Sequence, residues 1–234
     1  MEALNISQKG RAFAPMPPLL SFIHTVTSLP PVFSSLCSEL IPGAEIFHIV
    51  DESLLQTTIR EGSLTKATAR RLLGYFLSAQ EAGAGLAMVT CSSLGAAVEW
   101  CRPFLDIPIY RVDEPMAEKA IRLGSRIGVA ATLQTTLTPT LDLIRDRATQ
   151  AGEEKQITPY LCAGAFEALT AGDTARHDTL ILEGIAQLIP QVDVIVLAQA
   201  SMARVADQLP QTAGAPPILS SPRLAVESLA KTIA

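Results

Sequence analysis

The chain has 234 residues, of which 48% are hydrophobic and 18% are charged, and its formal net charge at pH 7 is −5. This size supports a substantial core, arranged as one large domain or two small ones. The acidic balance and the absence of a Lys/Arg cluster argue against a nucleic-acid partner, and no apolar run approaches the roughly 20 residues that cross a bilayer.

The first 18 residues are expected to form a loose arm, because three prolines interrupt them and they lack the apolar core of a signal peptide. The four cysteines show no CxxC spacing, which favours a reduced, cytoplasmic protein. No residues supply ligands at metal spacing, so no metal site is expected.

Short apolar runs, which are predicted strands, alternate with predicted helices along the rest of the chain, as in an α/β protein with parallel sheets. The stretch 51–60 is ambiguous between a loop and a short helix. The predicted strands cover residues 19–26, 44–50, 86–89, 107–112, 126–132, 156–162, 193–198 and 217–220. The predicted helices cover residues 30–40, 65–82, 94–101, 114–123, 139–150, 175–188, 202–209 and 222–233.

The same order of elements occurs twice, which indicates an internal duplication. Thr25 and Cys91 lie 66 positions apart (91 − 25), and Thr132 and Gln199 lie 67 apart (199 − 132). We predict two pseudo-symmetric α/β lobes, 19–115 and 116–221, each a mainly parallel four-stranded sheet flanked by helices. The strand ends would face each other across a cleft, which is a favoured place for a small ligand.

The stretch GLAMVTCSS, residues 85–93, is the clearest candidate for chemistry. Its apolar run reads as a buried strand that stops at Thr90, and a helical pattern resumes at Leu94. Ligands in open α/β sheets bind beyond the carboxyl ends of such strands. The start of a helix attracts carboxylates and lowers the pKa of a cysteine, so we predict that Cys91 is reactive and thiolate-like near neutral pH.

Several stretches together resemble the aspartate/glutamate/hydantoin racemase superfamily, over roughly residues 19–234. The stretches are FIHT (22–25), VTCSS (89–93), DEPMAEKAI (113–121), RIGVAATLQTTLTPT (126–140) and DVIVLAQASM (193–202). The resemblance implies an active site between two lobes, a closing helix 222–234 that packs back on the first lobe, and no cofactor. It also implies two cysteines, one per lobe, that move protons on opposite faces of the carbon next to a carboxylate.

This chain departs from that pattern in the second lobe, where Gln199 occupies the place of the second cysteine. A Gln amide neither gives nor takes a proton usefully near neutral pH. Three hypotheses follow. Cys91 acts in a racemase, epimerase or isomerase, with His24 or another group on the opposite face; or Cys91 is the sole proton donor of an arylmalonate-type decarboxylase; or the cleft belongs to a non-catalytic carboxylate-binding protein.

The remaining candidates are small polar residues near the predicted strand ends. Ser92 and Ser93 would donate to a substrate carboxylate or cap the following helix, and the threonines after residue 131 would bind a second polar group or stabilise a turn. His177 is expected to face solvent. The expected partner is a small carboxylate substrate, without nucleic acid or membrane, and homo-oligomerisation stays open. The predicted substrate-binding residues are Thr25, Thr90, Ser92, Ser93, Thr132, Thr135, Thr136, Ala200 and Ser201.

Overall fold

The computed structural model describes residues 18–209 and 214–233, so all but the last residue of the predicted N-terminal arm lies outside the described residues. The strands of the described part form two four-stranded sheets, ordered β2-β1-β3-β4 and β6-β5-β7-β8, and all neighbouring strands are parallel. This confirms the predicted fold class. The strands are β1 Leu19–His24, β2 Glu45–Val50, β3 Leu86–Val89, β4 Ile109–Arg111, β5 Arg126–Ala131, β6 Gln156–Leu161, β7 Val194–Leu197 and β8 Ile218–Ser220.

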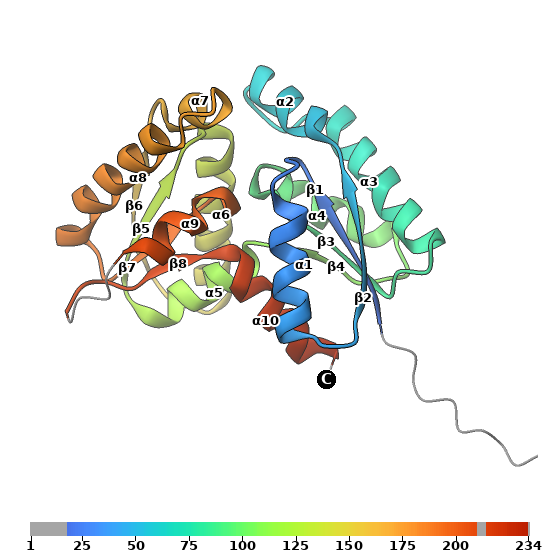
Figure 1. Ribbon diagram of the computed structural model, residues 1–234. Coiled ribbons are helices and arrows are strands. Elements are labelled where there is room, and N and C mark those ends of the chain that lie inside the picture. Colours follow the sequence, from blue (N-terminus) through green and yellow to red (C-terminus); the bar gives the residue numbers. More distant parts are fainter. Residues whose placement is uncertain (1–17, 210–213, 234) are drawn as a thin grey trace, which may run out of the picture.

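Helices flank both sheets, and the two resulting lobes lie side by side (Figure 1). We call β1–β4 with their helices the first lobe and β5–β8 with theirs the second lobe. Helices α2 and α7 face each other across the top of the gap in this view, and α10 lies at its base. The helices are α1 Leu29–Leu40, α2 Glu52–Arg60, α3 Lys66–Glu81, α4 Gly95–Cys101, α5 Glu114–Leu123, α6 Gln134–Gln150, α7 Ala165–Thr170, α8 Thr174–Leu188, α9 Ala203–Gln208 and α10 Ser221–Ile233.

The two lobes repeat one another at the ends of their central strands. A short 3-10 turn follows β3, at Ser92–Leu94, and another follows β7, at Ala200–Met202. The residue before each turn has a similar backbone conformation, φ −122° and ψ 110° at Cys91 and φ −117° and ψ 136° at Gln199. Cys91 and Gln199 are therefore structurally equivalent positions of a duplicated unit.

Two helices differ from the sequence prediction in ways that affect the site. Helix α6 begins at Gln134 rather than at Pro139, because the helix tolerates this proline at the cost of one backbone hydrogen bond. The earlier start places Thr136 in the first turn. Helix α7 has no counterpart in the prediction. The ambiguous stretch 51–60 forms helix α2, whose N-cap Asp51 accepts a hydrogen bond from the backbone N–H of Ser53.

His177 is not on the surface, as its sequence context predicted, but fully buried on α8. Its Nδ1 lies 2.9 Å from Oδ1 of Asp178, and Asp178 pairs with Arg204 of α9. Its polar sequence neighbours Asp173, Thr174, Arg176 and Thr179 are exposed, so His177 is the buried position on a helix whose other face is solvated.

Within residues 18–209 and 214–233, the chain crosses between the lobes twice. The first crossing is residues 112–113, between β4 and α5, and in the second β8 runs directly into α10. Helix α10 packs on α1 and α5. Its Ala225, Val226 and Leu229 are buried in one cluster with Leu20 and Phe22 of β1. The lobe boundaries at residues 115/116 and 221/222 stay a prediction.

Helix α4 lies against a buried ion pair at Gly95. Both side-chain N–H groups of Arg111 that face Asp113 donate to its carboxylate at 3.0 Å, and both residues are buried. A Cβ atom on Gly95 would lie 2.5 Å from Cζ of the Arg111 guanidinium. The absence of a side chain at position 95 is therefore what lets α4 approach β4.

We expect the substitution Gly95→Ala to lower the free energy of unfolding by about 1–3 kcal/mol, because it forces a held guanidinium to move. Urea denaturation measures the effect. The matched control is Gly74→Ala on α3, where an added Cβ meets no atom within 4 Å. That exposed helix position should instead gain about 0.5–1 kcal/mol from the better helix former. Equal effects at the two positions would contradict the packing argument.

Candidate active site

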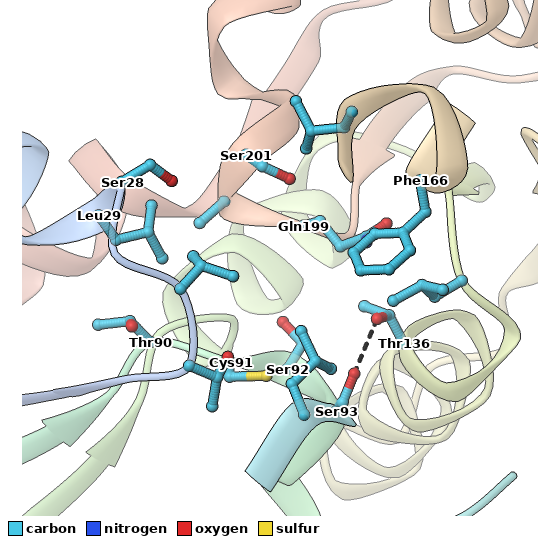
Figure 2. A pocket seen from close by; sticks show the side chains of 16 residues that line it. Ser28, Leu29, Thr90, Cys91, Ser92, Ser93, Thr136, Phe166, Gln199 and Ser201 are labelled. Atoms are coloured by element: carbon cyan, nitrogen blue, oxygen red, sulfur yellow. Dashed lines mark hydrogen bonds between the residues drawn. The ribbon is translucent and has the colours of Figure 1, made fainter. Parts of the chain in front are cut away.

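A small cavity lies between the lobes, beyond the carboxyl ends of their central strands. Its volume is about 70 Å³. None of the described residues that line it is charged, and the apolar ones come from both lobes. Figure 2 shows Cys91 on one side of the cavity and Gln199 with the ring of Phe166 on the other. The lining residues are Thr25, Val26, Ser28, Leu29, Leu55, Thr90, Cys91, Ser92, Ser93, Leu133, Thr136, Phe166, Leu169, Gln199, Ala200 and Ser201.

The structure brings most of the residues singled out in the sequence to this cavity. The predicted residues that line it are Thr25, Thr90, Cys91, Ser92, Ser93, Thr136, Gln199, Ala200 and Ser201. Three predicted residues do not line it. His24 lies behind the wall, Thr132 holds the Gln199 side chain, and Thr135 has a buried hydroxyl without a hydrogen-bond partner in the described structure.

The Cys91 thiol is enclosed by the cavity wall, and burial raises the pKa of this thiol above its ordinary value. The sulfur accepts hydrogen bonds from the hydroxyls of Thr25 and Ser93 and from the backbone N–H groups of Ser93 and Leu94. These bonds lower the pKa of the thiol, but by less than burial raises it. The expected thiolate-like character is therefore wrong. Cys91 rests as a protonated thiol with hydrogen-bond donors ready to stabilise its thiolate.

The Gln199 amide is held in place by Thr132. Its Oε1 accepts from the Thr132 backbone N–H at 2.6 Å and from the Thr132 hydroxyl at 3.0 Å. Its Nε2 donates to the same hydroxyl at 2.8 Å. In the first lobe, Thr25 occupies the equivalent place beside Cys91. Each lobe therefore has a threonine that contacts the residue at the central strand end, but only one of these residues can transfer a proton.

Two hydrogen bonds join the lobes at the rim of the cavity. The Ser92 hydroxyl donates to the carbonyl oxygen of Ala198 at 3.0 Å, and Oγ of Ser93 lies 2.8 Å from Oγ1 of Thr136 (Figure 2). Ser92 and Ser93 are predicted carboxylate ligands, and their hydroxyls bond to Ala198 and Thr136 of the second lobe. A ligand that reaches them would replace one or both of these bonds.

His24 is fully buried, and both of its ring nitrogens have side-chain partners, Thr90 at 2.8 Å and His48 at 2.8 Å. It belongs to the same lobe as Cys91. The geometry therefore does not place His24 on the opposite face of a ligand, so the racemase hypothesis would need another group there.

The short helices α2 and α7 cover the cavity from opposite lobes. Leu55 of α2 and Phe166 and Leu169 of α7 line it. Sequence reasoning missed all three residues. A sequence signal for α7 was present, since glycines, which mark breaks between regular elements, lie on either side of it at positions 164 and 172. In the structure both glycines adopt φ of +82°.

We expect iodoacetamide to label Cys91 before the other cysteines. Cys37, Cys101 and Cys162 are buried, and burial raises the pKa of each to about 11. Because the pKa of Cys91 is also raised, its labelling rate should increase about tenfold per pH unit across pH 7–8 rather than level off. Mass spectrometry of digested protein measures this. Earlier labelling of another cysteine, or a plateau near pH 7, would contradict the site geometry.

Among the described residues, no group of three or more His, Cys, Asp and Glu side chains is placed to hold a metal ion. Within the same residues, no helix is long and apolar enough to span a membrane.

Two doubly wound parallel sheets that meet at their strand ends, with a thiol between them, define a class of two-lobed α/β enzyme whose site lies in the interlobe cleft. The chain belongs to the Asp/Glu/Hydantoin racemase family, whose model matches residues 25–229. No curated protein matches the chain. Membership of this family supports a racemase-type enzyme.

Solved structures share this fold. A glutamate racemase from Bacillus anthracis is 16% identical with a TM-score of 0.72, over 93% of this chain and 82% of the other. A glutamate racemase from Francisella tularensis, solved with D-glutamate, is 12% identical with a TM-score of 0.72, over 93% and 81%. An allantoin racemase from Klebsiella pneumoniae is 15% identical with a TM-score of 0.63, over 92% and 87%. At these identities the likeness shows the fold alone.

Proposed function

We propose that this chain is a cofactor-independent enzyme in which Cys91 transfers a proton at the carbon next to a carboxylate of a small substrate. One observation carries the proposal: Cys91 is the only described lining residue with an acid/base side chain useful near neutral pH. Gln199 occupies the equivalent place in the second lobe, so the transfer is confined to one face of the substrate.

The surroundings of Cys91 suit an anion that develops during the reaction. Removal of a proton from the α-carbon, or loss of a neighbouring carboxylate, leaves an enolate-like species that needs several hydrogen-bond donors. Ser92, Ser93 and Thr136 are hydroxyl donors beside the thiol, and the backbone N–H groups of Ser93 and Leu94 point toward it. They would hold the carboxylate while Cys91 acts on the adjacent carbon.

The substrate should carry an apolar group rather than a second charge. Leu29, Leu55, Phe166 and Leu169 face the cavity, and none of the described lining residues could pair with a charged side chain. This favours an α-substituted carboxylate or malonate with a compact apolar substituent. An acidic amino acid would leave its second carboxylate without a cationic partner.

A second candidate reaction, decarboxylation of a malonate, has a specific observation in its favour. Burial raises the pKa of Cys91, so the resting thiol is protonated and ready to donate rather than to abstract a proton. Loss of CO₂ would create the enolate, and Cys91 would protonate it on one face. Racemisation by contrast needs a base first and a second acid afterwards.

Incubation in D₂O with apolar α-substituted carboxylates and malonates distinguishes these reactions. We expect one solvent deuterium at the α-carbon and a product of a single configuration, followed by mass spectrometry and optical rotation together. Loss of CO₂ from the malonates assigns the decarboxylase. Full racemisation of a carboxylate would reveal a second acid/base group and contradict one-sided transfer. Binding without any exchange or turnover would assign the non-catalytic alternative.

A further inference from the structure

Four hydrogen-bonded side chains connect the cavity wall to the edge of the first lobe. His24 Nδ1 lies 2.8 Å from Oγ1 of Thr90, and His24 Nε2 lies 2.8 Å from Nδ1 of His48. On the far side, His48 Nε2 lies 2.9 Å from Oγ of Ser34. His24 is fully buried, whereas His48 and Ser34 are half-buried on β2 and α1. The chain of bonds therefore runs from the cavity to side chains that water reaches.

A backbone carbonyl sets the direction of this chain of bonds. The Thr90 hydroxyl donates to the carbonyl oxygen of Ile23 at 3.2 Å, so it accepts from the Nδ1–H of His24. His24 Nε2 then accepts from the Nδ1–H of His48, and His48 Nε2 accepts from the Ser34 hydroxyl. Both imidazoles are neutral in this arrangement, and every polar atom has a partner.

The second lobe provides an internal comparison. The positions equivalent to His24, His48 and Thr90 are the sixth residue of β5, the fourth of β6 and the residue after β7. They are occupied by Ala131, Pro159 and Ala198, which have no polar side chain. The duplicated scaffold therefore folds without this hydrogen-bond chain, which is present only behind the strand end that carries the thiol.

Few charged side chains lie near the hydrogen-bonded pair His24 and His48. Thr90, which follows β3 and precedes Cys91, and Phe33 and Ser34 of α1 contact the two imidazoles. The Asp51 carboxylate, which follows β2, is held by Ser53, Arg71 and Tyr75. Helix α10 packs in the apolar cluster that contains Phe22 and Phe33, and the rings of these two residues contact the histidines.

The two imidazoles of the His24–His48 pair are therefore neutral near pH 7. Burial, together with the neighbouring His48 ring, lowers the pKa of His24 to about 3, and burial also lowers the pKa of His48. A positive charge on either ring becomes favourable only if a negative charge arrives nearby.

We propose that an anion in the cavity beside Cys91 raises the pH at which the His24–His48 pair takes up one proton from solvent, and that the protonated pair supplies the positive charge that the cavity wall lacks. The proton adds to Nε2 of His48, and the Ser34 hydroxyl turns to accept from it. The proton on Nδ1 of His48 can then move across the shared bond to Nε2 of His24, one hydroxyl behind the cavity. When the anion leaves, the same proton returns to solvent.

The inference rests on the proposed function, which supplies the anion, but its test installs the anion chemically. Bromoacetate and iodoacetamide convert the Cys91 thiol to carboxymethyl and carbamidomethyl adducts, which have nearly the same size and differ by one negative charge. The chain has three histidines, so nitrogen-15 NMR can follow each imidazole. His177, buried in the second lobe, serves as the internal reference.

We expect the titration midpoint of the His24–His48 pair to lie about one to two pH units higher in the carboxymethyl adduct than in the carbamidomethyl adduct. This is the size expected for a unit charge on the far side of one hydroxyl at an effective dielectric constant of about 20. The imidazole signals of His177 should be the same in both adducts. Equal midpoints for the pair, or an equal change in the His177 signals, would overturn the proposal.

Two further comparisons keep the test decisive. In His24→Asn, the titration midpoint of His48 should differ less between the two adducts than it does in the unsubstituted protein, because the ring nearest the anion is gone. An undiminished difference there would show that the anion acts on His48 without the pair. Should the adducts not form cleanly, Cys91→Asp and Cys91→Asn provide the same charge comparison. Failure of the proposed function would instead appear as absent turnover by unmodified protein, and leaves these titrations unaffected.

Discussion

The substitution Cys91→Ser should lower the rate of proton transfer by about 10³-fold or more, because general acid/base catalysis by a side chain contributes about 10²–10⁴ and serine supplies almost none near neutral pH. The hydroxyl is close in size to the thiol and keeps the donors from Thr25 and Ser93, so substrate binding should change little. The loss should therefore fall on kcat, with KM nearly constant.

Deuterium incorporation from D₂O under single-turnover conditions measures the chemical step in this variant. Cys101→Ser is the matched control, since this buried thiol lies on α4 outside the cavity and should leave the rate unchanged once folding is verified. Retention of most of the activity by Cys91→Ser would refute the assignment of the acid/base group.

Gln199→Cys should have the second largest effect, on the stereochemical outcome rather than on the rate. The equivalent position in the first lobe places Thr25 beside the Cys91 sulfur, and Thr132 would contact the new thiol in the same way. The Thr132 backbone N–H, which in the wild type donates to the Gln199 amide oxygen, would stabilise a thiolate there. A substrate would then have an acid/base group on each face.

The expected result is that a product of one configuration becomes a mixture approaching equal parts, or that racemisation of an α-substituted carboxylate appears where wild type shows none. Chiral chromatography of the product measures both. Gln199→Ser is the matched control, because it also removes the amide but adds no useful acid. A change of equal size in Gln199→Ser would show that loss of the amide, and not a second thiol, alters the outcome.

The sequence predicted the two lobes and most of the cavity because these depend on local pattern. Apolar runs that end in small polar residues mark buried strands, and the repeat of 66 and 67 positions placed Cys91 and Gln199 at equivalent ends. The family resemblance agreed with the site between the lobes that the duplicated strand ends had already indicated. Strand order and register were not predicted, because they depend on pairing between segments far apart in the sequence.

What the sequence could not supply depends on long-range packing. The pKa of Cys91 is raised by burial in the cavity wall. The local sequence indicates that a helix begins after Cys91, but it does not indicate which distant residues bury the thiol. The bond between Ser93 and Thr136 joins residues 43 positions apart and requires both lobes. Phe166 was missed because α7 is a single short helix between two glycines, too short for a periodic pattern.

The two chain crossings between the lobes limit how the protein can open. A single connection would allow the lobes to swivel, whereas two connections leave rotation about the line that joins them as the easiest motion, in the manner of a hinge. Opening would separate Ser92 from Ala198, and closing would restore the same registration each time. Under the proposed function, a substrate held by both lobes would meet the Cys91 thiol in the same registration of the lobes in every turnover, and the two crossings would then add to the one-sided transfer that we attribute to Gln199.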